Sequence, residues 1–284
     1  MRTNERLAAE LARVARESAA EAWRLATDAR ERARFREIRR LRRWPRRTPT
    51  ETSLLGPAIR LVDAGSFLHA YEEIAVREVY AFAPRRRPMR VVDCGANIGV
   101  SVAYWKRLDP SARITAIEPD PAIFAALVEN CRRLGHPDVE TIEAAVWTAE
   151  GRARFWCEGS DSGRLVDAGG AGDGGSEAGV RTLRLRDLLG EPIDLLKLDV
   201  EGAEPEILAD CADRLAAVDH LFVEVHAFAG KPQPLADVLA ILKAAGYRVE
   251  LRPERAPARP FLDSRMRDGM DLQVGVFATR PAAP

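Results

Sequence analysis

The sequence predicts an α/β protein with a doubly wound, mostly parallel sheet. Short apolar runs of strand character alternate with amphipathic helical segments from residue 66 onward, and this alternation is typical of a parallel sheet covered by helices on both faces. Glycine-rich or acidic turns follow several of the strands, at the edge where such sheets bind their ligands. A chain of 284 residues, 46% of them hydrophobic, suits one large domain with an extension.

An arginine-rich extension, residues 1–57, precedes the predicted domain at residues 58–284. The first 50 residues hold fifteen arginines and seven acidic residues, a local net charge of +8, whereas the whole chain is neutral. The rest of the chain therefore carries a net charge of −8. Because a negative surface repels phosphate backbones, we expect no nucleic-acid partner for the domain.

The extension is predicted to form one helix over residues 4–44, with Asn4 as its N-cap, until Pro45 ends it. The segment 45–57 is interpreted as a linker. The helix is expected to be solvated or to self-associate into a homo-oligomer. Its alternative role is contact with an anionic membrane surface or with nucleic acid.

The helices of the domain follow from apolar residues at helical spacing and from the residues that end them. The segment "SFLHAYEEIAVREVYAF" has this spacing, and Gly246 stands where another helix is expected to end. We predict helices over residues 66–82, 99–108 and 120–134, from residue 203, and over residues 234–245.

The strands follow from short runs rich in Val, Ile and Leu, such as "RVVDC", "RITAIE" and "IDLLKLD". The last strand follows a Pro- and Arg-rich connection, and for this strand alone an antiparallel direction is left open. A Gly-, Asp- and Ser-rich segment over residues 158–180 is predicted to be a loop. The predicted strands are 90–94, 113–118, 139–146, 152–157, 181–185, 193–199, 219–226, 247–251 and 271–279.

The cysteine pattern and the hydropathy indicate a cytoplasmic protein. The four cysteines are widely spaced and include no C-x-x-C pair, which favours reduced thiols over disulfides or a zinc site. No apolar run approaches the ~20 residues of a transmembrane helix. The N-terminus lacks the apolar core of a signal peptide.

A glycine-containing turn, "VVDCGANIG", joins the first strand of the alternating region to its helix. Gly95, Asn97 and Gly99 open this helix, and glycines allow a tight turn and a close approach of the backbone to a ligand. The spacing is one residue shorter than the dinucleotide fingerprint G-x-G-x-x-G. Glu118 ends the next strand, nineteen residues after Gly99, where an acidic residue is the expected partner of ribose hydroxyls. Together these residues predict a nucleoside-containing cofactor.

A second motif, "LLKLDVEGAE", places three carboxylates directly after a buried strand. Acidic groups at such a position cost free energy unless they bind something. Glu204 is interpreted as a helix cap, which gains from the helix dipole, whereas a single cap does not require Asp199 and Glu201 as well. Lys197 is interpreted as structural, paired with Asp93 or with Glu224.

A third motif, "VEVH", ends the strand that is expected to lie beside the strand of Asp199. Glu224 and His226 are two residues apart, so their side chains face the same way. His226 is favoured as a functional residue over a strand-end histidine satisfied by its neighbours, because the groups around it are chemically suited to proton transfer.

Taken together, five segments resemble the FkbM family of S-adenosylmethionine-dependent methyltransferases. They are "VVDCGANIGVSVAYW", "AIEPDPAIFAALVENC", "EAAVWTAEGRARF", "LLKLDVEGAE" and "FVEVHAF", in this order and spacing. The resemblance covers about residues 66–252 and implies a Rossmann-like class I methyltransferase sheet with S-adenosylmethionine as its cofactor.

The resemblance also implies roles for single residues. The turn from Gly95 to Gly99 would pass the methionyl part of the cofactor, Glu118 would bind its ribose, and Ala145 would lie near its adenine. Glu201, and Ser162 within "SDSGRL", would contact the acceptor. The residues expected to bind the cofactor are Asp93, Gly95, Asn97, Gly99, Glu118, Pro119, Ala145 and Asp199.

The family resemblance implies O-methylation of a hydroxyl on a sugar, a glycolipid or a secondary metabolite. An alcohol must lose its proton to attack the methyl group, so the site needs a general base. His226 is the leading base, oriented by Glu224, and Asp199 is the alternative. These three residues have the donor types of a Mg²⁺ or Mn²⁺ site, but their spacing does not require one, and we expect no metal.

Three other functions share part of this pattern. An NAD(P)-dependent oxidoreductase would have the same sheet and Glu118, but its hydride transfer has no need of "LDVEGAE". A nucleic-acid methyltransferase that uses the basic N-terminal helix would share the cofactor, but for reactions at base amino groups it typically has a Pro-Pro-aromatic loop, and this chain has no Pro-Pro pair. A binding module built on the N-terminal helix would leave the strand-end acids without a role.

Overall fold

The structure is a computed structural model of the chain. It describes residues 28–157, 163–165, 176–254, 257, 259, 261–262, 266 and 269–281.

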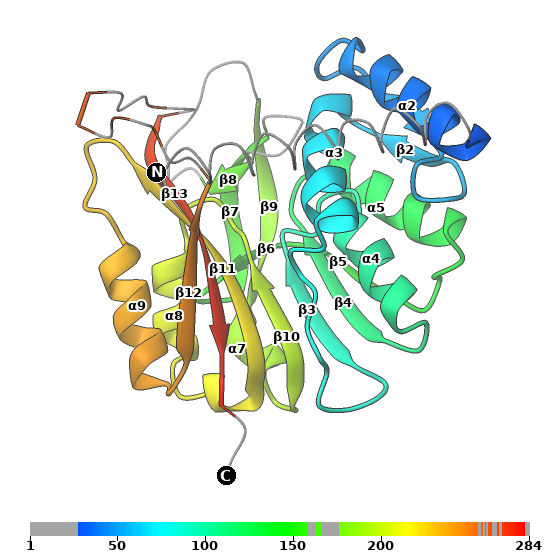
Figure 1. The fold of residues 1–284 in the computed structure, drawn as a ribbon. Coiled ribbons are helices and arrows are strands. Elements are labelled where there is room, and N and C mark those ends of the chain that lie inside the picture. The colour runs from blue at the N-terminus through cyan, green and yellow to red at the C-terminus, as the bar shows by residue number, and fades with distance from the viewer. Residues whose placement is uncertain are drawn as a thin grey trace, which may run out of the picture.

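A seven-stranded sheet forms the centre of the described residues, with helices on both of its faces (Figure 1). Its neighbouring strands pair in parallel, except that β13 is antiparallel to both β11 and β12. The doubly wound sheet and the antiparallel last strand of the sequence prediction are therefore confirmed. In sheet order the strands are β12 (Arg248–Pro253), β13 (Met270–Thr279), β11 (Val218–Phe228), β10 (Ile193–Leu198), β3 (Arg90–Cys94), β4 (Arg113–Glu118) and β5 (Glu140–Glu143).

The strand order reverses direction between β3 and β10. From β3 the chain proceeds outward through β4 to β5, and it later returns to β10 on the other side of β3 and continues to β11. Connections that leave such a pair of strands in opposite directions open a crevice at their carboxyl ends, where open α/β sheets bind ligands. The fold thus places a ligand site after Cys94 and Leu198.

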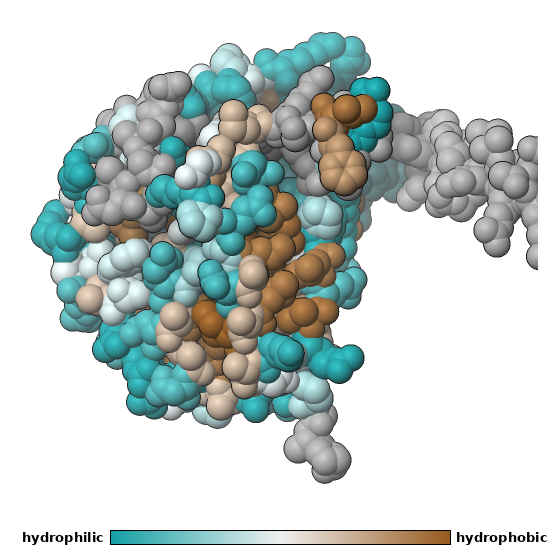
Figure 2. Space-filling model, turned by 90° about the vertical axis from the view of Figure 1, so that its left-hand side faces the viewer, coloured by the Kyte–Doolittle hydropathy of each residue, from teal (hydrophilic) through white to brown (hydrophobic). Residues whose placement is uncertain are grey.

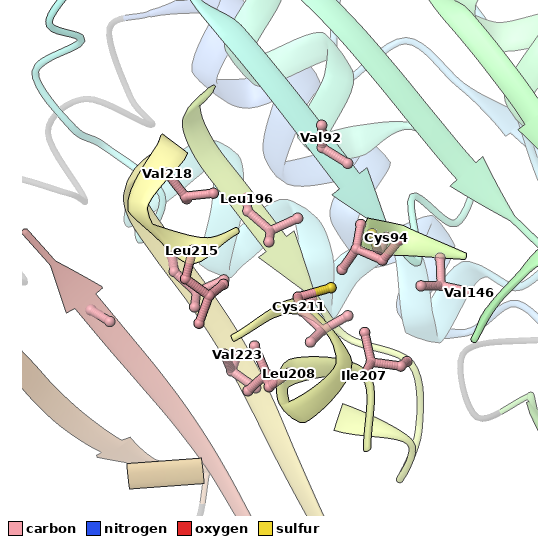
Figure 3. Packing of buried hydrophobic residues seen from close by; sticks show 14 of the residues in the cluster. Val92, Cys94, Val146, Leu196, Ile207, Leu208, Cys211, Leu215, Val218 and Val223 are labelled. Carbon is pink, nitrogen blue, oxygen red and sulfur yellow. The ribbon is translucent and has the colours of Figure 1, made fainter. Parts of the chain in front are cut away.

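Both faces of the sheet are buried, because successive strand residues contribute to opposite cores. Val91 and Leu195 pack on the side of α4 (Val100–Leu108) and α5 (Pro121–Arg133). Val92 and Leu196 pack on the other side, where Figure 3 shows them with Ile207 and Leu208 of α8 (Glu204–Cys211). Each fully buried aliphatic side chain of this kind stabilises the fold by roughly 1.5–3 kcal/mol. Helices α7 (Leu185–Leu188) and α9 (Leu235–Ala244) complete the second face.

The C-terminal part of the extension packs against the domain. Asp28 adopts an extended backbone and caps α2 (Ala29–Arg42), so the single helix predicted over residues 4–44 is interrupted there; residues 1–27 lie outside the described residues. Leu41 of this helix is 1% exposed and belongs to the same core as α4 and α5.

The predicted linker over residues 45–57 is wrong in part. It contains β1 (Thr50–Thr52), which pairs antiparallel with β2 (Ile59–Leu61). Arg40 holds the hairpin to α2 by donating hydrogen bonds to Thr50 and to the Glu51 carbonyl. The domain boundary at residue 57 stays a prediction.

The helix predicted over residues 66–82 begins earlier and ends earlier. It consists of α3 (Ala64–Ala70) and a π-helical turn, η1 (Tyr71–Val76). Single π-helical turns are frequent at functional sites. Because the helix ends before Tyr80, that side chain is free to turn toward the sheet, where its ring packs on Phe222 of β11.

The strand predicted over residues 139–146 divides at Ala144. Its first half is β5, whereas Ala145 begins β6 of a second, four-stranded sheet, in the order β6-β9-β7-β8. This small sheet closes one side of the ligand site with Phe155 and Leu165. Its strands are β6 (Ala145–Trp147), β9 (Ser176–Arg184), β7 (Gly151–Cys157) and β8 (Arg164–Leu165).

The end of the sheet near α9 carries apolar surface, which Figure 2 shows as brown side chains among hydrophilic ones. Val249 and Leu251 of the edge strand β12 are 43% and 44% exposed. They alternate with Arg248, Glu250 and Arg252, and such charges on an edge strand discourage pairing with another sheet. None of the helices in the described part of the chain is long and apolar enough to cross a membrane.

Candidate active site

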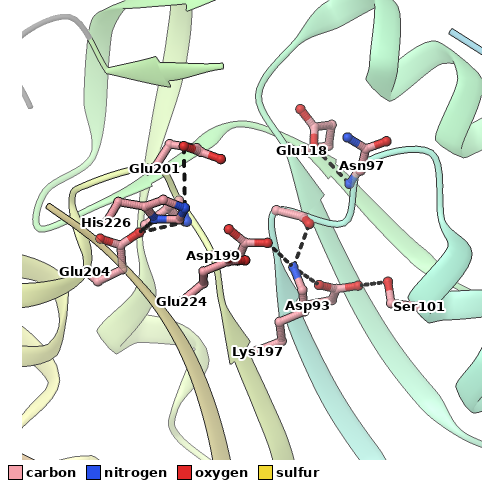
Figure 4. Close-up of polar contacts among 12 residues, drawn as sticks. Asp93, Asn97, Ser101, Glu118, Lys197, Asp199, Glu201, Glu204, Glu224 and His226 are labelled. Carbon is pink, nitrogen blue, oxygen red and sulfur yellow. Dashed lines mark hydrogen bonds and ion pairs between the residues drawn. The ribbon is translucent and has the colours of Figure 1, made fainter. Parts of the chain in front are cut away.

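A cavity lies at the carboxyl ends of β3, β4, β10 and β11, at the point where the strand order reverses. Helix α3, the η1 turn and the small sheet contribute its other walls. Two groups of predicted site residues face each other across it (Figure 4). Its lining includes Gly95, Asn97, Glu118, Asp199, Glu201 and Glu224.

Gly95 brings the first turn against the end of β10. Its φ is +86°, and a Cβ atom at this position would lie 2.1 Å from the Asp199 carbonyl oxygen. No other residue fits there without moving the backbone. Gly99 also has a positive φ, but it begins α4 beside Leu127 and is not part of the cavity lining. Gly99 thus shapes the start of the helix, and its contact with the cofactor stays a prediction.

Glu118 is fixed by two backbone donors. The amide of Asn97 donates to one carboxylate oxygen and the amide of Asp120 to the other, each at 3.0 Å. Burial raises the pKa of Glu118 to about 8, although both hydrogen bonds favour its ionised form. Pro119 and Ala145 line the same part of the cavity. The structure thus gathers most of the predicted cofactor residues around one buried carboxylate.

Asp93 lies behind this wall and supports Lys197. It is fully buried, accepts a hydrogen bond of 2.5 Å from the Ser101 hydroxyl, and stands 3.4 Å from the Lys197 ammonium. Lys197 also donates to the Gly95 carbonyl and to the Asp199 carboxylate. Burial opposes the charge of Lys197, but its two carboxylates outweigh burial and raise its pKa. The Lys197–Asp93 pair predicted from the sequence is confirmed, whereas Asp93 is not a lining residue of the cavity.

The acidic turn after β10 has a strained backbone. Glu201 adopts a φ of +59°, which is uncommon for a residue with a side chain. Gly202 follows with a φ of +106°, and a Cβ atom there would meet the Phe228 ring at 2.7 Å. Glu204 is the first residue of α8, whose N-cap is Ala203 without a side-chain cap hydrogen bond. Its carboxylate instead accepts hydrogen bonds from the amides of Gly202 and Val200 in the preceding turn, so the predicted helix cap is wrong and Glu204 holds the turn together. The strain aims Glu201 into the cavity.

His226 is buried behind the acidic residues. Its Nδ1 lies 3.0 Å from Glu204 Oε1 and its Nε2 lies 3.6 Å from Glu201 Oε2. Burial opposes a proton on the ring, but Glu201 and Glu204 outweigh it and raise the pKa of His226 well above its usual value. Burial raises the pKa of Glu201 to about 8 and that of Glu224 to about 7.

The structure brings the three predicted catalytic residues together. One possible ligand atom each of Asp199, Glu224 and His226 lies within 4.8 Å of the others. Asp199 and Glu224 line the cavity, whereas His226 does not and is 2% exposed. Its predicted partner also differs, since Glu204 holds the ring and Glu224 instead accepts a hydrogen bond from Gln273. Ser162 lies outside the described residues.

Sequence reasoning missed several residues of the cavity. Tyr80 lines it because η1 ends early. The Arg252 guanidinium of β12 lies 2.8 Å from the Glu73 carboxylate of η1. This ion pair connects two elements of the cavity wall that are far apart in the sequence. Gln273 comes from β13. No motif marks these residues, and only the pairing of β13 with β11 places Gln273 beside Glu224.

Known proteins share this sequence pattern. The model of the methyltransferase FkbM domain matches residues 93–249. The chain is 29% identical over 215 residues to Methyltransferase 1 of Beauveria bassiana (strain ARSEF 2860), covering 67% of this chain and 84% of that protein. It is 28% identical over 234 residues to the 31-O-demethyl-FK506 methyltransferase FkbM of Streptomyces tacrolimicus, covering 68% and 86%.

Among solved structures, the chain is similar to M. jannaschii TYW2 in complex with AdoMet. The TM-score is 0.47 with 17% sequence identity, over 84% of this chain and 89% of that chain. The FkbM domain match spans more than half of the sequence and contains the glycine turn, Glu118 and the acidic cluster, which consists of Asp199, Glu201, Glu204 and Glu224. The protein therefore belongs to the FkbM family of methyltransferases, with S-adenosylmethionine as its cofactor.

Proposed function

We propose that the protein transfers a methyl group to a hydroxyl of a sugar, a glycolipid or a secondary metabolite. The observation that carries this proposal is the position of Asp199 and Glu224. Both carboxylates line the same cavity as the glycine turn and Glu118. A methyl donor bound at the turn would thus face acidic groups able to act on a hydroxyl proton.

The residues at the turn fit S-adenosylmethionine. Gly95 has no side chain, so the turn packs directly against the Asp199 carbonyl and its backbone lines the cavity together with Ala96 and Asn97. Glu118 presents a buried carboxylate that suits the two hydroxyls of a ribose. Ala145 and Phe155 supply apolar surface of the kind that an adenine contacts. When bound, this cofactor supplies an activated methyl group on a sulfonium centre.

The chain must then position the acceptor and remove its proton. Positioning a nucleophile in line with the methyl carbon supplies much of the rate in such a transfer. An alcohol keeps its proton at neutral pH, so a group at the site must help to remove it. We assign removal of the hydroxyl proton to the acidic cluster. The ring of His226 lies behind Glu201 and outside the cavity lining, so its role as the general base stays a prediction.

The far side of the cavity suits a hydroxyl-rich acceptor. Glu73, Arg252, Glu254 and Gln273 place charged and amide groups on its wall, and such groups bind hydroxyls by hydrogen bonds. The name of the relative from Streptomyces tacrolimicus, a 31-O-demethyl-FK506 methyltransferase, records methylation of an O-demethyl compound. Both observations support oxygen as the methylated atom.

Calorimetry and a methyl-transfer screen test the proposal. Purified protein is titrated with S-adenosylmethionine and then incubated with sugars, glycolipids and polyketides that carry free hydroxyls. We expect binding, and mass spectrometry should detect one added methyl group on an oxygen of at least one acceptor class. Transfer confined to nitrogen, or to nucleic acid, would overturn the hydroxyl assignment.

A further inference from the structure

We propose that Asp199, Glu224 and His226 bind a divalent cation, Mg²⁺ or Mn²⁺, at the acceptor side of the cavity. The inference deepens the proposed function and rests on it only for the role of the ion, not for its binding. One ligand atom from each residue lies within 4.8 Å of the other two. Octahedral Mg²⁺ with bonds of about 2.1 Å separates its ligand atoms by roughly 3–4 Å. Small side-chain rotations therefore complete the site, in contrast to the metal-free site expected from the sequence.

The orientation of His226 is the first argument for a cation. Glu204 accepts hydrogen bonds from two backbone amides, and we assign the Nδ1–H of the ring as a third donor to this carboxylate. The Nε2 atom lies 3.5 Å from Gln273 Nε2 and 3.6 Å from Glu201 Oε2. These separations are too long for good hydrogen bonds. A histidine held through one nitrogen by a carboxylate is the usual arrangement of a metal ligand.

The balance of charge is the second argument. Asp199, Glu201, Glu204 and Glu224 surround one imidazole. Lys197 is engaged by Asp93, Asp199 and the Gly95 carbonyl. Glu201 Oε2 is buried without a hydrogen-bond partner, and its side chain is 12% exposed. Buried carboxylates need a compensating positive charge, and a divalent ion between Glu224 and Asp199 supplies it.

The ion would have an open side toward the acceptor. Asp199 and Glu224 line the cavity, so the coordination positions that protein atoms leave free face it. A hydroxyl bound there becomes more acidic, as water does on a bound metal ion. Its proton leaves to water in the open cavity, its oxygen bonds to the methyl carbon, and the carbon–sulfur electron pair stays on sulfur. The positive sulfonium becomes a neutral thioether, so charge is balanced.

Binding of the metal alone tests the inference. The full-length protein is treated with EDTA, dialysed and titrated with Mn²⁺, and free Mn²⁺ is followed by electron paramagnetic resonance without cofactor or acceptor. We expect one Mn²⁺ per chain. Asp199→Asn and Glu224→Gln should each weaken binding at least tenfold, and Glu204→Gln should weaken it about 10- to 100-fold by releasing the ring of His226. Glu250→Gln, on the exposed edge strand β12, is the matched acidic control and should bind like the wild type.

Two results would overturn the inference: no Mn²⁺ binding by the wild-type protein at millimolar concentration, or binding that all three variants retain. Melting temperature and cofactor affinity show whether each variant is folded. Methyl transfer to a hydroxyl that proceeds unchanged in EDTA would exclude the proposed role of the ion in proton removal while supporting the proposed function. Specific Mn²⁺ binding without transfer to any hydroxyl would support the site and count against the function.

Discussion

Gly95 and Asp199 are 104 positions apart in the sequence and touch through their backbones. A Cβ atom on Gly95 would lie 2.1 Å from the Asp199 carbonyl oxygen, and the Asp199 amide donates to the carbonyl of Cys94. This contact fixes the glycine turn, which lines the cavity, to the first residue of the acidic cluster. The two halves of the cavity are therefore positioned by one backbone junction rather than by flexible side chains.

Substitution at this junction is expected to remove cofactor binding. Gly95→Ala adds a Cβ that cannot be accommodated and strains a φ of +86°, a combination that costs roughly 1–3 kcal/mol or more. We expect a lower melting temperature and at least tenfold weaker binding of S-adenosylmethionine by calorimetry. Gly190→Ala is the matched control, because nothing lies within 4 Å of that position. Equal affinity in Gly95→Ala and Gly190→Ala would show that the turn is not part of the cofactor site.

Glu118 is expected to supply a main polar contact to the cofactor. Its carboxylate is held by the amides of Asn97 and Asp120 and lines the cavity. Glu118→Ala should weaken S-adenosylmethionine binding by ~1–3 kcal/mol, since a pair of ribose hydroxyls would lose its partner. Glu143→Ala, at the exposed last residue of the neighbouring strand β5, should leave the affinity unchanged. Unchanged affinity in a folded Glu118→Ala protein would exclude this residue from the site.

Cofactor affinity should depend on pH through Glu118. Burial raises the pKa of its carboxyl to about 8, so the free protein holds a proton there at neutral pH. Hydroxyl donors favour the ionised form, so affinity should rise as the pH increases toward 8 and level off above it, with release of a proton. Calorimetry in buffers of different ionisation enthalpy measures that proton. Glu118→Gln should bind with a flatter pH profile, and a wild-type profile without any change around pH 8 would contradict this account.

The raised pKa of Glu118 also affects the stability of the folded protein, which should decrease as the pH rises, whereas the cofactor affinity should increase. Between the unfolded-state pKa of about 4.5 and the folded-state pKa of about 8, only the folded protein holds the Glu118 proton. The contribution of this group to stability is therefore complete below pH 4.5 and is lost as the pH rises through 8. The melting temperatures of Glu118→Gln and wild type should converge below pH 4.5 and diverge as the pH rises from 4.5 to 8, with the variant the more stable. A constant difference across this range would argue against a buried, protonated Glu118.

The sequence predicted the sheet and the strand-end residues because both depend on local pattern. Apolar runs such as "RVVDC" are buried on both faces, and Asp199, Glu118 and Glu224 stand where these strands end or near it. The predictions were wrong where the backbone geometry, rather than the residue pattern, determines the boundaries of an element. The small residues Ala144 and Ala145 do not reveal that the chain leaves one sheet and enters another, and the η1 turn has no sequence signal that separates it from α3.

The partner of His226 could not be predicted for a similar reason. Two residues of separation place Glu224 and His226 on the same side of β11, and this much the sequence predicted. The ring is instead held by Glu204, which begins a helix in another part of the chain. A contact between two segments that are distant in the sequence leaves no pattern in composition or periodicity.

The described part of the extension is expected to stabilise the domain. Leu41 is 1% exposed in the core that α4 and α5 share, so Leu41→Ala should lower the free energy of unfolding by ~2–5 kcal/mol. Deletion of residues 1–48 removes this side chain as well and should destabilise the protein similarly. Leu108→Ala, at a position 40% exposed, is the control for denaturant unfolding. Wild-type stability in both altered proteins would show that the extension is independent after all.

His226 separates the two accounts of how the hydroxyl loses its proton. In both, His226→Ala should keep S-adenosylmethionine affinity within a few-fold, because the ring lies outside the cavity lining, and should lose roughly 10²–10⁴ in turnover.

If the ring is a general base, the loss is the same at every Mg²⁺ concentration, and the wild type works in EDTA. If the ring is a metal ligand, EDTA abolishes wild-type turnover, and excess Mg²⁺ restores part of the activity of His226→Ala, since Asp199 and Glu224 remain. His136→Ala, at a histidine outside the cavity lining, controls for general effects on folding. Turnover in His226→Ala near that of the wild type would exclude both roles and leave the proton to Asp199 or to solvent.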